Sequence, residues 1–237
     1  MKARLIRTDQ VAAGTAGFAF ELDDPFTFEA GQTCDITIAS APYQDEKGSS
    51  RTFSIASSPA DAPRILVATR LTGSAFKRTL LEAATGFEVD VDGPFGSFVL
   101  HKNAARPAVF FAGGIGITPF RSIIKDATER RLPHRMTLFY SNRTEAGTAF
   151  LQEFEAWQAA NPNFRLVASI DEPPADGRWT HHTGAMDLAF IESSLNGSAD
   201  GVCYLAGPPG FVKAMRSALD RLGFDPDNIR TEEFSGY

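Results

Sequence analysis

The sequence is poor in the residues that usually hold metal ions. It contains two cysteines, Cys34 and Cys203, and four histidines, and they do not cluster at the spacing of a zinc or iron–sulfur site. The two cysteines are far apart, in the strand-like segments TCDITI and VCYLAG. We therefore expect both to be small buried side chains, not a disulfide or a reactive thiol, and we predict no metal site.

Long apolar runs are also absent. No run approaches the ~18 residues that a membrane-spanning helix needs. The N-terminal stretch MKARLIRTDQVAAG lacks the apolar segment of a secretion signal. A net charge of −6 argues against nucleic acid as a partner. We expect a cytoplasmic protein without membrane insertion.

The charge is distributed unevenly along the chain. Residues 1–46 carry a net charge of −5, residues 47–135 carry +6 and residues 136–237 carry −7. A positive middle between negative ends fits a protein whose centre binds anions. The same distribution can also arise by chance on a solvated surface.

The first hundred residues predict an all-β domain. Short segments rich in Val, Ile, Phe and Thr are separated by Gly, Pro, Asp and Ser, and several alternate with a period of two. They are FAFELDD, CDITIAS, RTFSIAS, RILVATRL and GFEVDVDGP. This pattern is typical of a small antiparallel barrel. One helix is expected within it, over Gly73–Gly86, with a serine start and a closing glycine.

From about Ala104 onward, strand-like and helix-like segments alternate. The predicted strands are PAVFFAGG, RMTLFYSNR, FRLVASI and GVCYLAGPP, and the helices that follow them are TPFRSIIKDATERR, TAFLQEFEAWQAAN, GAMDLAFIESSL and FVKAMRSALDRLG. Such alternation predicts βαβ units and a parallel sheet. We therefore predict two domains, an antiparallel β-barrel over residues 1–102 and a Rossmann-like α/β domain over residues 103–237.

The stretch FFAGGIGITPF joins the first parallel strand to its helix. Gly113, Gly114 and Gly116 lie at the carboxyl end of that strand, where open α/β sheets bind ligands. Thr118 is the expected N-cap, with Pro119 at the first helical position, where the Rossmann fingerprint would have glycine. Backbone N–H groups in such a loop can approach a diphosphate. An ordinary tight turn would use the same residues.

Five short motifs occur in a fixed order along the chain: RTFS, GPFGSF, GGIGITPF, AGPP and a C-terminal EEF. In this order, and with the two-domain pattern, the sequence resembles the ferredoxin–NADP⁺ reductase-like flavoprotein family over essentially its whole length. The resemblance implies an FAD-binding barrel followed by a domain that binds a nicotinamide nucleotide.

The resemblance places FAD on the barrel. It implies that Arg51 pairs with the flavin diphosphate, for which a guanidinium is suited. Phe53 stands where the family usually has Tyr against the isoalloxazine ring, and Ser54 hydrogen-bonds near flavin N5. The further cofactor-binding residues implied are Thr52, Ala68, Thr69, Arg70, Gly73, Ser74, Ala75 and Phe76. FMN-binding relatives exist, but the helix start GSAF favours FAD; Ser74 also fits a plain N-cap.

The resemblance assigns the nicotinamide dinucleotide to the second domain. The implied diphosphate-binding residues are Gly113, Gly114, Gly116 and Thr118, with Gly207 and Pro208 facing the nicotinamide. Ser141 and Arg143 end the next strand, where an acid favours NAD and an arginine accommodates a 2′-phosphate. This favours NADP(H) over NAD(H), although a solvated turn explains the same residues.

The C-terminal TEEFSGY supplies the last part of the implied site. Glu232 would lie near Ser54 as a proton relay, and Phe234 would cover the other face of the flavin. Tyr237 is the alternative cover, because some relatives end in a stacking tyrosine. The remaining alternative is an ordinary frayed tail.

The implied activity is that of an NAD(P)H-dependent flavoprotein reductase. Hydride passes from the nicotinamide to flavin N5, with Ser54, Glu232 and Phe234 as the catalytic residues, and electrons pass to a separate acceptor. That acceptor would be a ferredoxin- or flavodoxin-type protein, docked through the basic side chains of Arg121, Lys125 and Arg130, or an oxygenase component. Two alternatives stay open: a flavin or ferric reductase with a small-molecule acceptor, and a non-catalytic flavin-binding subunit.

Overall fold

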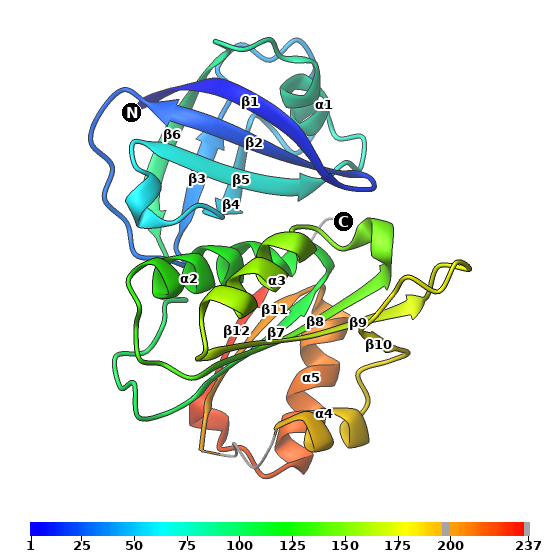
Figure 1. Ribbon diagram of the computed structural model, residues 1–237. Helices are drawn as coiled ribbons and strands as arrows, with labels where there is room; N and C mark the ends of the chain where they lie inside the picture. The colour runs from blue at the N-terminus through cyan, green and yellow to red at the C-terminus, as the bar shows by residue number, and fades with distance from the viewer. Residues whose placement is uncertain (196–199, 235–237) are drawn as a thin grey trace.

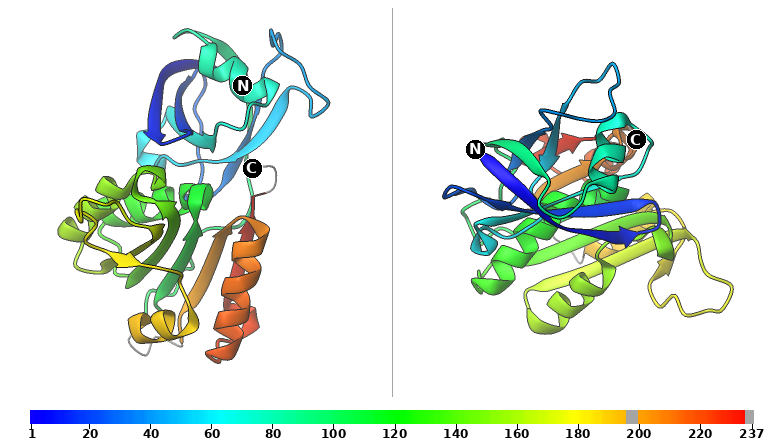
Figure 2. Two further views of the ribbon diagram at one scale, coloured as in Figure 1. Left: turned by 90° about the vertical axis from the view of Figure 1, so that its right-hand side faces the viewer. Right: turned by 90° about the horizontal axis from the view of Figure 1, so that it is seen from above.

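The computed structural model describes residues 1–195 and 200–234 and contains two six-stranded sheets, one above the other (Figures 1 and 2). The first sheet is antiparallel, with strand order β4-β3-β6-β1-β2-β5, and it closes around a core of Phe, Ile, Leu and Val. Its elements are β1 Lys2–Ala12, β2 Thr15–Leu22, β3 Thr33–Thr37, β4 Ser50–Ser54, β5 Arg64–Arg70, α1 Ala75–Glu82 and β6 Glu88–Phe95.

The second sheet is parallel, with strand order β10-β9-β8-β7-β11-β12. Helices α2 and α3 cover the face toward the barrel, and α4 and α5 cover the other face (Figure 1). The elements are β7 Ala108–Gly113, α2 Thr118–Glu129, β8 Met136–Thr144, α3 Leu151–Ala160, β9 Phe164–Glu172, β10 His182–Thr183, α4 Leu188–Leu195, β11 Val202–Gly207, α5 Pro209–Arg221 and β12 Ile229–Glu233. The predicted fold class is confirmed.

The sequence analysis missed three strands: β1, which lies between β6 and β2 in the first sheet, and the two edge strands of the second sheet, β10 and β12. In β1, buried Ala3 and Leu5 alternate with exposed Lys2 and Arg4, but the second half of the strand has no buried residue and hides the pattern. Strand β12 pairs in parallel with β11 along its whole length. The start of the C-terminal segment TEEFSGY, which the sequence analysis assigned to the site with a frayed tail as the alternative, is therefore part of a sheet edge.

The two cysteines are free and buried, as expected. Among residues 1–195 and 200–234, no helix is long and apolar enough to cross a membrane. Within the same ranges, no group of three or more His, Cys, Asp or Glu side chains could hold a metal ion.

Helix α2 is attached to the barrel by side chains on one of its faces. Arg121 donates from Nη1 to the carbonyl oxygen of Ala56 at 2.7 Å, and Ser122 donates from Oγ to the carbonyl oxygen of Ser57 at 2.6 Å. Ser122 is fully buried. Both carbonyls belong to the segment that directly follows β4, so the helix and that strand are held in one relative position.

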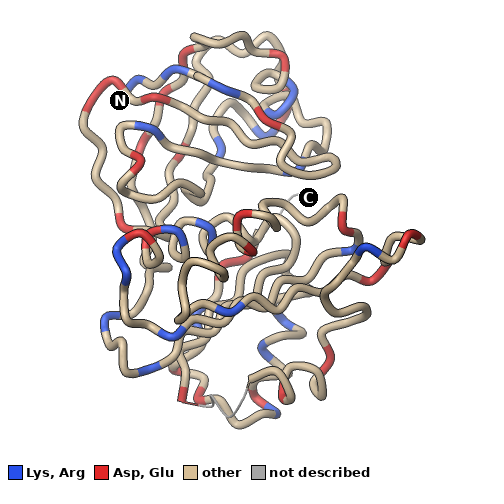
Figure 3. Tube along the Cα trace, in the orientation of Figure 1, with Lys and Arg blue, Asp and Glu red and all other residues tan. Residues whose placement is uncertain are grey.

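The basic residues on this face of α2 do not form the docking surface that the sequence analysis expected. Lys125 forms an ion pair with Asp61 at 2.5 Å, and the side chains of Arg121 and Lys125 are only 11% and 19% exposed. Arg130 is exposed but pairs with Asp126. Basic and acidic residues lie next to each other at this junction (Figure 3). The docking expectation is wrong for Arg121 and Lys125, because these cations join the two halves of the molecule.

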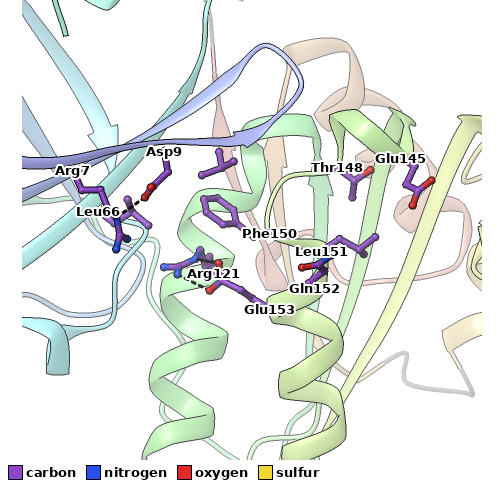
Figure 4. A pocket seen from close by; sticks show the side chains of 11 residues that line it. Arg7, Asp9, Leu66, Arg121, Glu145, Thr148, Phe150, Leu151, Gln152 and Glu153 are labelled. Carbon is purple, nitrogen blue, oxygen red and sulfur yellow. Dashed lines mark hydrogen bonds and ion pairs between the residues drawn. The ribbon is translucent and has the colours of Figure 1, made fainter. Parts of the chain in front are cut away.

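A cavity of about 400 Å³ lies beside this junction, between β1 and the start of α3 (Figure 4). In it, Arg121 donates to Glu153 at 2.6 Å and its guanidinium lies 4.8 Å from the ring centroid of Phe150. The arginine is thus bound on three sides, by the barrel carbonyl, the carboxylate and the ring.

The connection between the two sheets packs with the second one. Phe98 lies 5.7 Å from Phe120 and 5.6 Å from Tyr204, measured between ring centroids. It follows β6 but precedes the expected boundary. The core of the second domain therefore includes a residue that precedes position 102. The domain limits 1–102 and 103–237 stay a prediction.

The glycine turn after β7 is packed against the end of β11. Gly114–Ile117 forms a short 3-10 turn between β7 and α2. A Cβ atom on Gly116 would lie 2.3 Å from the carbonyl oxygen of Ala206. Gly114 has φ +54°, in the left-handed region, and a Cβ there would meet nothing within 4 Å. The two glycines are needed for different reasons.

Substituting these two glycines should therefore have unequal effects on stability. We expect Gly116→Ala to lower the free energy of unfolding by about 3 kcal/mol, because backbone must move to admit the methyl group. Gly114→Ala should cost about 1 kcal/mol, the strain of a left-handed alanine. Urea unfolding of the flavin-free proteins measures both. Equal losses would contradict the packing account.

Candidate functional site

A cavity of about 460 Å³ lies where the barrel meets the second domain. Most of its lining comes from β4, β5, the start of α1 and the loops beside them, and two residues come from the second domain. The lining residues are Lys47, Arg51, Thr52, Phe53, Ser54, Ala68, Thr69, Thr72, Ser74, Lys77, Thr118 and Phe234. Seven of the residues implied for FAD on the barrel are thus brought together.

Aromatic packing supports the barrel side of this cavity. The ring of Phe53 lies 5.9 Å from the ring of Phe76. Phe76 is 2% exposed and belongs to the barrel core. Phe53 therefore offers a supported face at the cavity, whereas Phe76 can contribute only backbone.

Arg51 is the main cation on β4, and it is already engaged. Its Nη2 donates to Asp45 at 3.3 Å, and its Nη1 donates to the carbonyl oxygens of Lys47, Gly48 and Ser50 at 2.7 to 2.9 Å. Its neighbour Thr52 donates to Asp35. The guanidinium is thus held by residues of the β3–β4 connection.

The start of α1 adds backbone donors. Ser74 is the N-cap and accepts from the backbone N–H of Lys77 at 3.4 Å, as the plain N-cap interpretation expects. The N–H of Ala75 donates to Asp45 Oδ2 at 2.9 Å. Gly73, with φ +75°, supplies the turn before the helix. Arg70 is exposed and outside the cavity lining.

Lys77 is a cavity residue that the sequence analysis missed. Its Nζ donates to Thr72 Oγ1 at 3.1 Å. Burial lowers the pKa of Lys77, and the neighbouring charges of Lys47 and Arg51 lower it further. A lysine three residues after an N-cap serine was the available signal.

Glu232 lies beside Ser54, as the resemblance implied. Ser54 Oγ donates to Glu232 Oε1 at 3.5 Å, the outer limit of a hydrogen bond. The other oxygen, Oε2, is buried and has no hydrogen-bond partner among the described residues. Burial raises the pKa of Glu232 to about 7. Strand β12 positions this carboxyl opposite Ala206 of β11.

Phe234 directly follows β12 and lines the cavity. Its backbone N–H donates to the carbonyl oxygen of Gly207 at 3.0 Å. This hydrogen bond fixes the backbone of Phe234 at the end of β11, and its side chain lines the cavity together with residues of β4 and β5. Tyr237, the alternative cover, lies outside the described residues.

The implied nucleotide-binding residues gather at the carboxyl ends of β7 and β11. The strand order reverses between these neighbours, and open α/β sheets bind ligands at such a point. Gly113 and Gly207 approach closely, since a Cβ on Gly207 would lie 2.9 Å from the carbonyl oxygen of Gly113, and Pro208 beyond them is exposed. Thr118 is not the expected N-cap: its backbone is already helical and its hydroxyl donates to the carbonyl oxygen of Ile115 at 3.1 Å.

At the end of β8, the two residues expected near the adenosine ribose, Ser141 and Arg143, and Asn142 between them have different surroundings. Ser141 is partly exposed, and Asn142 is 7% exposed with its side-chain nitrogen unpartnered within the described ranges. Arg143 is exposed and forms an ion pair with Glu172 at 2.9 Å. The arginine that favoured NADP(H), Arg143, is therefore paired with Glu172, an acid at the end of the next strand, β9.

The donors around the cavity fit FAD. Arg51 and the N-terminal N–H of α1 suit a diphosphate, because both offer hydrogen bonds to anionic oxygens. The rings of Phe53 and Phe234 suit an aromatic system. The unpartnered Glu232 oxygen and the Ser54 hydroxyl suit its polar edge.

Comparison with known proteins agrees with this geometry. The family model for an oxidoreductase NAD-binding domain matches residues 110–217. Phenol hydroxylase P5 protein of Acinetobacter pittii is 29% identical over 98% of this chain and 65% of its own length. A component of the Na⁺-translocating NADH-quinone reductase of Methylococcus capsulatus is 34% identical over 64% of this chain and 38% of its own length. The chain thus spans less than two thirds of these curated relatives.

Among solved structures, the Amycolatopsis cytochrome P450 reductase GcoB superposes with a TM-score of 0.84 and 25% identity. The match covers 99% of this chain and 70% of that one. The motifs, the cavity between barrel and sheet, and the relatives agree: residues 110–217 match the oxidoreductase NAD-binding domain, and the chain as a whole is similar to ferredoxin reductase-like FAD- and NAD-binding oxidoreductases.

Proposed function

We propose that the protein is an FAD-dependent reductase that accepts hydride from a nicotinamide nucleotide and passes electrons to a separate acceptor. The observation that carries the proposal is the meeting of two half-sites at one cavity, β4 and α1 on the barrel side with Thr118 and Phe234 on the other. The glycine turn that binds the nucleotide in our proposal leads directly into Thr118.

The side chains have distinct roles in this proposal. FAD would supply the hydride and electron chemistry. Arg51 and the N–H of Ala75 would hold its diphosphate, and Ser54 would donate to the ring edge. Glu232 would hold a proton next to Ser54, and a pKa near 7 suits that role at neutral pH. Phe234 would exclude water and move aside when the nicotinamide enters.

For the nucleotide, we propose NADH. The sequence favoured NADP(H) through Arg143, but that guanidinium is paired with Glu172. A 2′-phosphate would have to compete with the carboxylate, whereas a ribose hydroxyl could donate to it. The quinone reductase relative is named for NADH.

For the acceptor, we propose a redox partner of the oxygenase type. One relative is a phenol hydroxylase component and a similar structure is a cytochrome P450 reductase. The small-molecule reductase and the non-catalytic flavin-binding protein stay as alternatives.

Anaerobic mixing tests the function and the nucleotide together. We expect NADH to bleach the flavin absorbance of the FAD-loaded protein about tenfold faster than NADPH, the factor of one charge-assisted contact. Stopped-flow absorbance measures both rates. Failure of both nucleotides to bleach the flavin would support the non-catalytic alternative instead. A faster reaction with NADPH would restore the sequence-based preference.

The raised pKa of Glu232 predicts a pH-dependent stability. The unfolded carboxyl titrates near 4.5 and the folded one near 7, so the folded state favours the protonated form. Glu232→Gln and wild type should be equally stable below pH 4.5. As the pH rises from about 4.5 to about 7, wild type should lose stability relative to the variant, and above pH 7 the difference should level off at no more than on the order of 3 kcal/mol.

Urea unfolding of the flavin-free proteins at pH 5 and pH 8 measures this difference. Ser54→Ala serves as a companion variant: it leaves the carboxyl in place but removes the hydrogen bond that lowers its pKa, so the loss of stability with rising pH should persist. A stability difference between Glu232→Gln and wild type that stays constant from pH 5 to pH 8 would show that the carboxyl titrates normally.

A further inference from the structure

One carboxylate holds the two groups assigned above to the flavin diphosphate. Asp45 Oδ2 accepts from the N–H of Ala75 at 2.9 Å, and Asp45 Oδ1 accepts from the guanidinium of Arg51 at 3.3 Å. The carboxyl thus bridges the N-terminal end of α1 and strand β4. A bridging anion at a helix N-terminus beside an arginine is the arrangement that a phosphate group adopts.

The charges around Asp45 are strongly positive. Lys47, Arg51 and Lys77 all line the cavity, and the first two lower the pKa of Lys77. The N–H of Ala75 is the main cause of a lowered pKa of Asp45. The carboxylate therefore stays ionised and offsets part of the positive charge of this cluster.

Asp45 lies on a segment that can move at little cost. We call residues 39–48, between β3 and β4, the strap. None of its residues is buried. Its attachments outside the Arg51 contacts include a hydrogen bond from Tyr43 to Glu82 on α1 and the guanidinium of Arg78 over the Tyr43 ring. Displacing the strap would therefore break mainly polar surface contacts, together with the packing of the partly buried Ala41 against the edge of the barrel core.

We propose that the strap is a displaceable plug, in which Asp45 occupies the diphosphate position of the flavin-free protein and leaves it when FAD binds. This inference rests on the proposed function. Lys47 belongs to the strap and would leave with it, whereas Arg51 and Lys77 stay at the cavity. A diphosphate carries more negative charge than a carboxylate, so it neutralises these two cations more fully. Arg51 and the N–H of Ala75 would thus have an anionic acceptor before and after FAD binds: Asp45 in the flavin-free protein and the diphosphate in the FAD-bound protein. FAD affinity is then reduced by the free energy of opening the strap.

Removing the charge of Asp45 tests the plug. Asp45→Asn should bind FAD about tenfold more tightly and associate with it faster, because one charge-assisted interaction no longer competes. Glu46→Gln is the matched control: it removes the same charge from the neighbouring, exposed residue and should stay within about twofold of wild type. Flavin fluorescence during titration of the flavin-free proteins measures the affinity, and stopped-flow mixing measures the association rate.

A second measurement follows the strap directly. Hydrogen exchange at the Ala75 amide should be faster in flavin-free Asp45→Asn than in flavin-free wild type. FAD should protect the amide equally in both. Unchanged or weaker FAD binding by Asp45→Asn, with Glu46→Gln like wild type, would overturn the plug and make Asp45 a ligand or bystander of the bound cofactor.

The proposed function can fail separately from the plug. If wild type binds no flavin, the function is wrong, and titration with inorganic pyrophosphate then tests the plug alone. Tighter pyrophosphate binding by Asp45→Asn than by wild type would support a carboxylate that competes for this site. Equal binding by both proteins would overturn it.

Discussion

The position of helix α2 is the constraint on which the candidate site depends. Its first turn follows the glycine loop, and its side contacts the segment after β4 through Arg121 and Ser122. Two half-sites from different domains are thus fixed to one rigid element. Ser122 is fully buried, and the carbonyl that it satisfies would otherwise be a costly unpaired acceptor. The relative position of the half-sites is consequently specified by two hydrogen bonds between residues that are distant in sequence.

The parallel edge strand β12 extends this constraint to the acid. Pairing with β11 places Glu232 opposite Ala206 and beside Ser54, in surroundings that give only one of its oxygens a partner among the described residues. A buried carboxyl with one unpaired oxygen costs stability at neutral pH. Natural sequences retain such costs mainly at functional sites. Strand β12, which holds Glu232 in these surroundings, leads directly into Phe234 at the cavity. One element of the second domain therefore positions both residues.

Much of this arrangement could be predicted from the sequence, and the exceptions have physical causes. The buried strands and amphipathic helices of the second domain follow from periodicity, which is strong when both faces of a sheet are covered. Strand β1 was missed because charged side chains interrupt its alternation, and β12 because an edge strand needs few apolar residues. Asp45 and Lys77 were missed as site residues because their importance comes from tertiary proximity to Arg51. The expected docking role of Arg121 and Lys125 failed for the same reason: their partners are distant in sequence.

The glycine turn shows why a motif alone does not identify a phosphate site. Gly116 is required by the carbonyl oxygen of Ala206, and Gly207 by the backbone of Gly113, whether or not a ligand binds. Among Gly113, Gly114, Gly116 and Gly207, it is Gly114 that combines a left-handed backbone with open space in front of its Cα. Tight backbone packing at the point where β7 and β11 diverge leaves the loop amides at the edge of the sheet, and Gly114 is where a ligand could approach them. Packing and ligand binding are thus consequences of the same close approach of two strands, and the site owes its location to that approach.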